Sequence, residues 1–71
     1  MIILTRRHGG SVAVNCDLIE RVEAAPETVV TLVDGSRYVV AESVAAVVDK
    51  VRDFRASVVK LYLVPSPDPD A

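Results

Sequence analysis

The side chains that most often carry chemistry are scarce in this sequence. It contains one histidine, His8, and one cysteine, Cys16. His8 lies beside Gly9-Gly10 and has no second histidine with which to build a three-ligand metal site. Cys16 precedes Asp17, whose negative charge opposes formation of a thiolate nucleophile. We therefore expect His8 to be a solvated turn residue and Cys16 to be a small buried or half-buried side chain.

Acidic pairs and glycine motifs do not indicate an enzyme either. Glu20 and Glu23 stand three apart on a predicted strand, so they should point to opposite faces instead of forming an acid/base pair. Neither Gly9-Gly10 nor Asp34-Gly35 is followed by the Lys and Ser/Thr of a phosphate-binding loop. The sequence therefore predicts no catalytic residue, no cofactor and no metal, and hence a protein that is not an enzyme.

Three arginines form the only local excess of positive charge in the part of the chain predicted to be sheet: Arg6, Arg7 and Arg37. Together they are the candidate anionic contact. No aromatic platform accompanies them, and scattered surface cations are common. A solvated edge that discourages aggregation is therefore favoured over an anion site.

Length and charge limit the remaining possibilities. A chain of 71 residues has room for one domain with one core. Its net charge of -2 argues against DNA binding and does not favour RNA. Arg6 and Arg7 interrupt the N-terminal apolar run, and no segment has the ~18 uncharged residues of a membrane span. With a single cysteine, these features predict a cytoplasmic protein without a membrane span.

Short extended segments dominate the N-terminal half. In each, apolar and polar residues alternate or β-branched residues cluster. The predicted strands are residues 1–7, 11–14, 20–24, 28–33 and 36–40. Turns are expected at 8–10, where glycines permit positive φ, and at 25–27, where Pro26 fixes φ. Asp34-Gly35 predicts a two-residue hairpin of type I′, in which both residues have positive φ.

After Val40 the apolar residues recur at intervals of three and four, which predicts an amphipathic helix. The apolar stripe is Val44, Val47, Val48, Val51, Phe54, Val58, Leu61 and Tyr62. Ser43 is the predicted N-cap. Residues 58–64 also have strand propensity, but the 4-3-4-3 spacing of the stripe continues through them and favours a helix.

These elements predict an α+β fold in one domain over residues 1–64. Five short antiparallel strands should be followed by one C-terminal amphipathic helix that covers a face of the sheet. Three prolines then follow, and the Pro-rich tail at 65–71 is expected to be disordered.

The predicted helix is longer than the predicted strands. A helix of about 20 residues spans about 30 Å, while strands of five or six residues reach about 17 to 20 Å. The end of the apolar stripe should therefore project beyond the sheet. Val58, Leu61 and Tyr62 are the candidate partner or oligomer interface, and a homo-oligomer is expected, because an uncovered apolar stripe commonly marks an interface.

An ordered series of blocks runs from the N-terminus to the start of the predicted helix. The blocks are residues 1–6 (MIILTR), Asn15, residues 17–20 (DLIE), Val22-Glu23, residues 26–28 (PET), Asp34-Gly35, residues 38–40 (YVV) and Glu42-Ser43. Together they resemble the small flagellar FlbD family, which includes SwrD-like proteins, from Met1 to about Arg55. The resemblance implies a motility protein that supports flagellar motor function or assembly, with no catalytic residue to carry over.

Combined with the lack of catalytic residues, the resemblance suggests a binding or scaffolding module. Its partner would be a flagellar motor or assembly protein, and its location would be the cytoplasm, peripheral to the flagellar motor.

The opening residues also resemble a second family. Residues 1–11 (MIILTRRHGGS) look like the start of the carbon-storage regulator family, small dimeric proteins that bind mRNA through opposed edge strands. That family's later basic segment has no counterpart in residues 38–43, which contain Glu42 and no Arg or Lys. A small RNA-binding post-transcriptional regulator is therefore the alternative function. A salt titration with structured RNA would separate the two, because phosphate contacts weaken steeply with salt.

Overall fold

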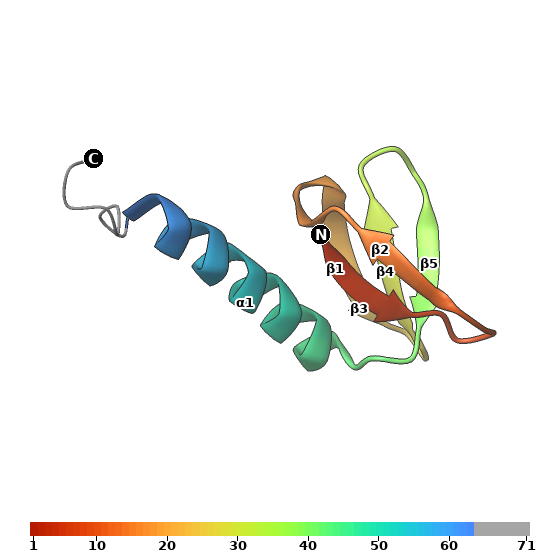
Figure 1. The fold of residues 1–71 in the computed structure, drawn as a ribbon. Helices are drawn as coiled ribbons and strands as arrows, with labels where there is room; N and C mark the ends of the chain where they lie inside the picture. Colours follow the sequence, from red (N-terminus) through yellow and green to blue (C-terminus); the bar gives the residue numbers. More distant parts are fainter. Residues whose placement is uncertain (64–71) are drawn as a thin grey trace, which may run out of the picture.

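Two small sheets and one long helix make up the structure (Figure 1). The computed structural model describes the fold of residues 1–63 and the side-chain surroundings of residues 1–58. The predicted disorder of residues 65–71 lies outside these residues. The elements are β1 (Ile2–Thr5), β2 (Ser11–Val14), the 3-10 helix η1 (Cys16–Leu18), β3 (Ile19–Ala24), β4 (Thr28–Leu32), β5 (Arg37–Val40) and α1 (Val44–Leu63). The predicted α+β fold is confirmed.

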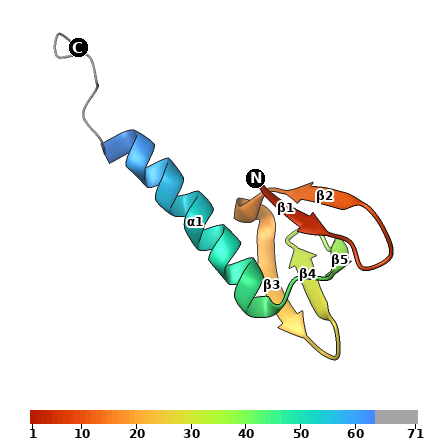
Figure 2. The ribbon, with the colours of Figure 1, turned by 60° about the horizontal axis from the view of Figure 1, so that its bottom comes forward.

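The two antiparallel sheets are joined at one edge. β1 pairs with β2, and β4 lies between β3 and β5. Just past its own hairpin pairing, the end of β1 runs against β5. There the Arg7 N–H donates to the Val39 carbonyl at 2.9 Å, and the Ala41 N–H donates to the Thr5 carbonyl at 2.8 Å. These bonds hold the β1–β2 hairpin against the β3-β4-β5 sheet (Figure 2).

The turn at Asp34-Gly35 is not the predicted type I′. The Gly35 N–H donates to the Leu32 carbonyl at 3.0 Å and the Leu32 N–H donates to the Ser36 carbonyl at 2.8 Å, so the loop has the three residues 33–35. Gly35 has a φ of +93°, while Asp34 does not have a positive φ. This is the pattern of a three-residue loop that ends in a glycine bulge. Asp34 contributes through its carboxylate, which accepts from the Ser36 N–H at 2.8 Å.

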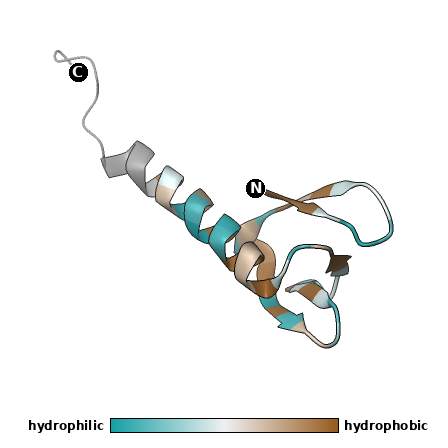
Figure 3. Ribbon diagram, turned by 90° about the horizontal axis from the view of Figure 1, so that it is seen from below, coloured by the Kyte–Doolittle hydropathy of each residue, from teal (hydrophilic) through white to brown (hydrophobic). Residues whose placement is uncertain are grey.

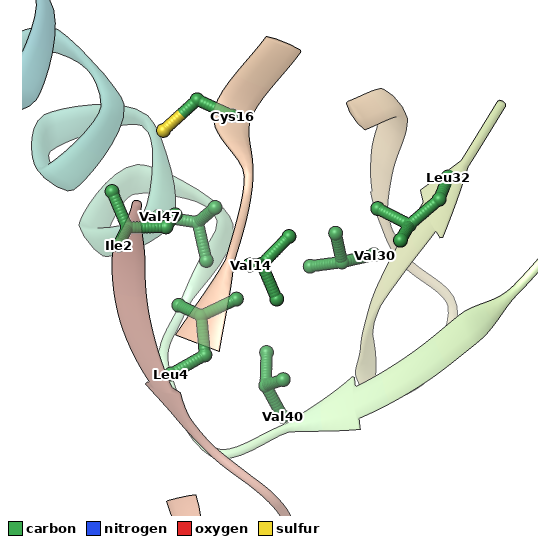
Figure 4. Close-up of a cluster of buried hydrophobic side chains, with 8 residues drawn as sticks. All are labelled: Ile2, Leu4, Val14, Cys16, Val30, Leu32, Val40 and Val47. Atoms are coloured by element: carbon green, nitrogen blue, oxygen red, sulfur yellow. The ribbon is translucent and has the colours of Figure 1, made fainter. Parts of the chain in front are cut away.

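The core lies between the β1–β2 hairpin and the β3-β4-β5 sheet (Figure 4). Its buried side chains are Ile2, Leu4, Val14, Cys16, Val30, Leu32, Val40 and Val47. On β1, Ile2 and Leu4 are buried while Ile3 and Thr5 are exposed, because successive strand residues point to opposite faces. Val47 joins this set from the helix with 0% exposure, so the first turns of α1 are anchored in the core.

Helix α1 begins at its predicted cap. The Ala46 N–H donates to Ser43 Oγ at 3.0 Å, which satisfies one of the backbone donors left free at a helix start. The helix then continues to Leu63, so residues 58–63 are helical, as the spacing predicted, and do not form a final strand.

The sequence predicted that the helix covers a face of the sheet, and this prediction is wrong. Its closest neighbours are β1 and β3, and its later turns extend away from the sheets (Figure 1). The inner face of the β3-β4-β5 sheet is already covered by the β1–β2 hairpin, so the helix has access only to one side of the core. The Cα radius of gyration is accordingly 15.1 Å, whereas a compact chain of this length has about 11 Å.

Candidate functional site

An apolar groove of about 650 Å³ runs between the start of β3 and the projecting helix. We call it the apolar groove; its lining residues are Cys16, Ile19, Val22, Val47, Val48, Val51, Arg52, Arg55 and Ala56. In Figure 3, apolar residues lie in the first turns of α1, next to the sheets, and hydrophilic residues follow further along the helix. Among the lining residues of the groove, the buried Cys16 and Val47 form an apolar base and the exposed Arg52 and Arg55 a charged rim.

The groove is open to solvent at Val48. Val48 has an exposure of 42%, although it lies between the buried Val47 and the half-buried Val51. Arg55, which also lines the groove, forms an ion pair with Asp17 of η1, at 3.3 Å between Nη2 and Oδ1. This exposed pair connects the helix to the 3-10 turn. Such a surface can bury apolar side chains of another molecule.

The predicted interface residues lie beyond the groove on the same helix. Val58 is half-buried, and Leu61 and Tyr62 belong to the last turns of α1. The side chains of Leu61 and Tyr62 lie outside the described residues. The sequence had indicated the helix side of this surface but not the wall formed by Cys16 and Ile19. Cys16 belongs to a polar corner and Ile19 is the first residue of β3. No periodicity in the sequence marks either residue as a neighbour of the helix.

A second surface lies between the first hairpin turn and β5. We call it the basic hollow; it has a volume of about 430 Å³ and is lined by Arg6, His8, Gly9, Arg37, Tyr38 and Val39. The structure thus brings together two of the three arginines predicted as an anionic contact. The third, Arg7, instead pairs with Glu27, at 3.1 Å between Nε and Oε1. The expectation that no aromatic residue accompanies them is wrong, because the Arg6 guanidinium lies 5.7 Å from the centre of the Tyr38 ring.

The acidic residues of β3 are arranged differently from the expectation. Glu20 is the extra residue where the β3–β4 register shifts between Ile19 and Arg21, so strict alternation is lost there. As a result both Glu20 and Glu23 bond to Arg21 and are not separated onto opposite faces; the distance from Arg21 Nε to Glu23 Oε1 is 2.6 Å. The hydrogen bond and charge of Glu23, together with the charge of Glu20, raise the pKa of Arg21 above its ordinary value. The two carboxylates therefore hold a guanidinium.

The two residues considered for metal or nucleophilic chemistry, His8 and Cys16, lie on different surfaces. His8 lies in the basic hollow, whereas Cys16 is buried at the base of the apolar groove with 3% exposure. Within the described part of the chain, no group of three or more His, Cys, Asp or Glu side chains is placed to hold a metal ion. No helix among the described residues has both the length and the apolar composition to cross a bilayer.

The fold and these two surfaces define a small α+β domain with one long projecting helix. Residues 1–59 match the family model of FlbD, flagellar and swarming motility proteins. The chain belongs to this family, and the matched region contains both the apolar groove and the basic hollow. No curated protein and no solved structure matched the chain. The resemblance inferred from the sequence blocks is confirmed.

Proposed function

We propose that this protein is a non-enzymatic binding or scaffolding module for flagellar motor function or assembly. It acts in the cytoplasm, peripheral to the flagellar motor, by docking a flagellar motor or assembly protein. The observation that carries the proposal is the apolar groove beside α1. An open apolar surface of this size is costly for a small monomer to leave in water, and it commonly serves as an interface.

The shape of the groove suits a helical partner. One wall is the straight helix α1 and the other is η1 and the start of β3, so a second helix could lie along it with its apolar face inward. Arg52 and Arg55 stand at the rim. They would favour a partner helix that carries acidic residues beside its apolar face, because opposite charges at an interface rim guide association.

The projecting end of α1 supports a second contact. Val58 continues the stripe of Val51 and Phe54 past the point where the sheets can cover it. We assign this end, with Leu61 and Tyr62, to pairing with a second copy of the chain. The groove and the helix end would then serve two different contacts on one rigid element, as expected of a scaffold.

Binding to the groove can be tested with two glutamate substitutions one helical turn apart. Val48→Glu places a charge in the groove at an exposed position, so the fold should tolerate it. Ala45→Glu is the matched control, because Ala45 is exposed, lies in the first turn of α1 and does not line the groove. In motile cells that depend on this protein, Val48→Glu is expected to reduce swimming and swarming strongly and Ala45→Glu to leave them near wild type.

Circular dichroism and cellular protein level should be the same for both variants. Normal motility with a folded, normally expressed Val48→Glu protein would show that the groove does not carry the function.

A further inference from the structure

The arginines of this protein fall into two groups. Four of the six form an ion pair with a carboxylate: Arg7 with Glu27, Arg21 with Glu20 and Glu23, Arg52 with Asp49, and Arg55 with Asp17. Arg6 and Arg37 form no ion pair with any carboxylate of residues 1–58. These two arginines line the same basic hollow, and no acidic side chain lines it with them. The hollow therefore holds positive charge that the rest of the described chain does not neutralise.

The backbone of Arg6 is held by its neighbours, and its guanidinium lies near an aromatic ring. Its backbone N–H donates to the Gly10 carbonyl at 2.9 Å, and Arg6 forms a bridge with Val40 of β5. Its guanidinium lies 5.7 Å from the centre of the half-buried Tyr38 ring, within the range of a cation–π contact. A side chain ordered in this way loses less conformational entropy on binding than a free one.

The chemistry of the hollow suits an oxyanion. A guanidinium offers a planar fork of N–H donors that matches a carboxylate or a phosphate. The His8 ring and the Tyr38 hydroxyl can supply further hydrogen bonds from the same walls. Carboxylates would come from an acidic protein segment, whereas phosphates would come from RNA.

The charge around the hollow favours an acidic protein segment over RNA as the ligand. RNA binding requires a series of cations along the backbone, but Arg7, the nearest further cation in sequence, is paired with Glu27. The whole chain has a net charge of -2. Two guanidiniums in one hollow are enough for one or two carboxylates and too few for a phosphate backbone.

We propose that the basic hollow docks the carboxylate side chains of an acidic segment of a partner protein, held by Arg6 and Arg37. The proposal rests on the proposed function in that the partner is a protein. It concerns a separate surface, however, since the basic hollow and the apolar groove share no lining residue.

The test is an NMR titration of the 15N-labelled protein at physiological salt, followed at the arginine Nε–Hε signals. Hexaglutamate peptide is the first probe and hexauridylate RNA, of similar charge, is the second. We expect hexaglutamate to shift the Arg6 and Arg37 signals saturably and more tightly than the RNA does. Arg6→Gln and Arg37→Gln should each weaken peptide binding about tenfold. Arg21→Gln, which removes an exposed arginine that lines neither the hollow nor the groove, should not change it.

The proposal is overturned if the peptide shifts all arginines alike, or if Arg21→Gln weakens binding as much as the hollow variants. Tighter binding of the RNA that depends on Arg6 and Arg37 would also overturn it and assign the hollow to phosphate. Both hollow substitutions are at exposed positions, and amide spectra will verify that the variants stay folded. Because this assay does not involve motility or the groove, its failure is distinguishable from failure of the groove proposal.

Discussion

The Glu42 carboxylate accepts hydrogen bonds from both the backbone N–H and the hydroxyl of Thr5, each at 2.9 Å. The two residues are 37 positions apart in the chain. Their contact joins the end of β1 to the segment that leads into α1, next to the bond from the Ala41 N–H to the Thr5 carbonyl. It therefore holds the start of the helix against the first strand and helps to set the direction in which α1 projects.

Loss of the Glu42 charge is expected to destabilise the protein. Glu42→Gln leaves one acceptor oxygen and removes the charge that strengthens the bonds from Thr5, which should cost about 1 kcal/mol in the free energy of unfolding at this half-buried position. Urea unfolding at neutral pH measures the change. Glu23→Gln is the control, because its ion pair with Arg21 is exposed and should contribute little. Equal effects of the two substitutions would contradict a special role for Glu42.

Glu42 should also make stability depend on pH in the acid range. Burial alone would raise the pKa of Glu42, but the hydrogen bonds from Thr5 and from the backbone of Glu42 itself, together with the charge of Lys50, lower the pKa below the ordinary 4.5. A lowered folded pKa gives stabilisation that is fully present above the unfolded pKa and is lost as the pH falls through the folded pKa. The wild type should therefore lose more stability below about pH 4.5 than Glu42→Gln does. Asp34, whose pKa is lowered by its bonds from Ser36, contributes equally to both proteins. Parallel pH profiles would argue against this assignment.

The core should depend strongly on β1. Leu4 is fully buried with 0% exposure, while its neighbour Ile3 is 56% exposed on the other face. Leu4→Ala is expected to cost about 2 to 5 kcal/mol, a large part of the total of about 4 to 11 kcal/mol that a chain of this length can have. Ile3→Ala should be close to neutral. Thermal unfolding followed by circular dichroism compares the two, and similar midpoints would contradict the packing of Figure 4.

Self-association is expected to depend on the end of the apolar stripe. Val58→Glu places a charge on the stripe, whereas Ser57→Glu adds the same charge at an exposed position one residue earlier. Light scattering should find the wild type and Ser57→Glu as oligomers and Val58→Glu as a folded monomer; Leu61→Glu should behave like Val58→Glu. A wild type that stays monomeric at high concentration, together with a Val58→Glu protein that unfolds, would place Val58 in the monomer's own packing instead.

One buried hydroxyl should be dispensable. Thr31 is 5% exposed, and its Oγ1 has no hydrogen-bond partner among the described residues. Thr31→Val replaces that unpaired polar group by a methyl group of similar size and is expected to stabilise the fold by about 1 kcal/mol. Thr5→Val is the same substitution at a hydroxyl that does have a partner, Glu42, and should destabilise the fold. Urea unfolding should show changes of opposite sign in the free energy of unfolding for the two variants. A loss of stability in Thr31→Val would mean that the Thr31 hydroxyl forms a hydrogen bond in solution.

Local pattern was enough to predict the five strands and the helix of this protein, but not the 3-10 helix η1 or the type of turn at Asp34-Gly35. The short apolar run at Ile2 to Leu4, the cap at Ser43 and the three-and-four spacing that follows each depend on residues a few positions apart. Strand pleat and helix pitch are local properties, so such patterns predict them directly. The blocks that resemble FlbD could likewise be recognised without a structure.

Tertiary structure alone decided how the elements meet, because contacts between distant residues leave no local periodicity. Three arginines looked equivalent in the sequence, but the bridge from Arg6 to Val40 of β5 places Arg6 in the same hollow as Arg37, while Arg7 pairs with Glu27. The position of the helix was decided in the same way. Its amphipathic stripe predicts that one side is buried, but the β1–β2 hairpin takes the inner face of the other sheet, and α1 is left with a groove along β3 and a projecting end.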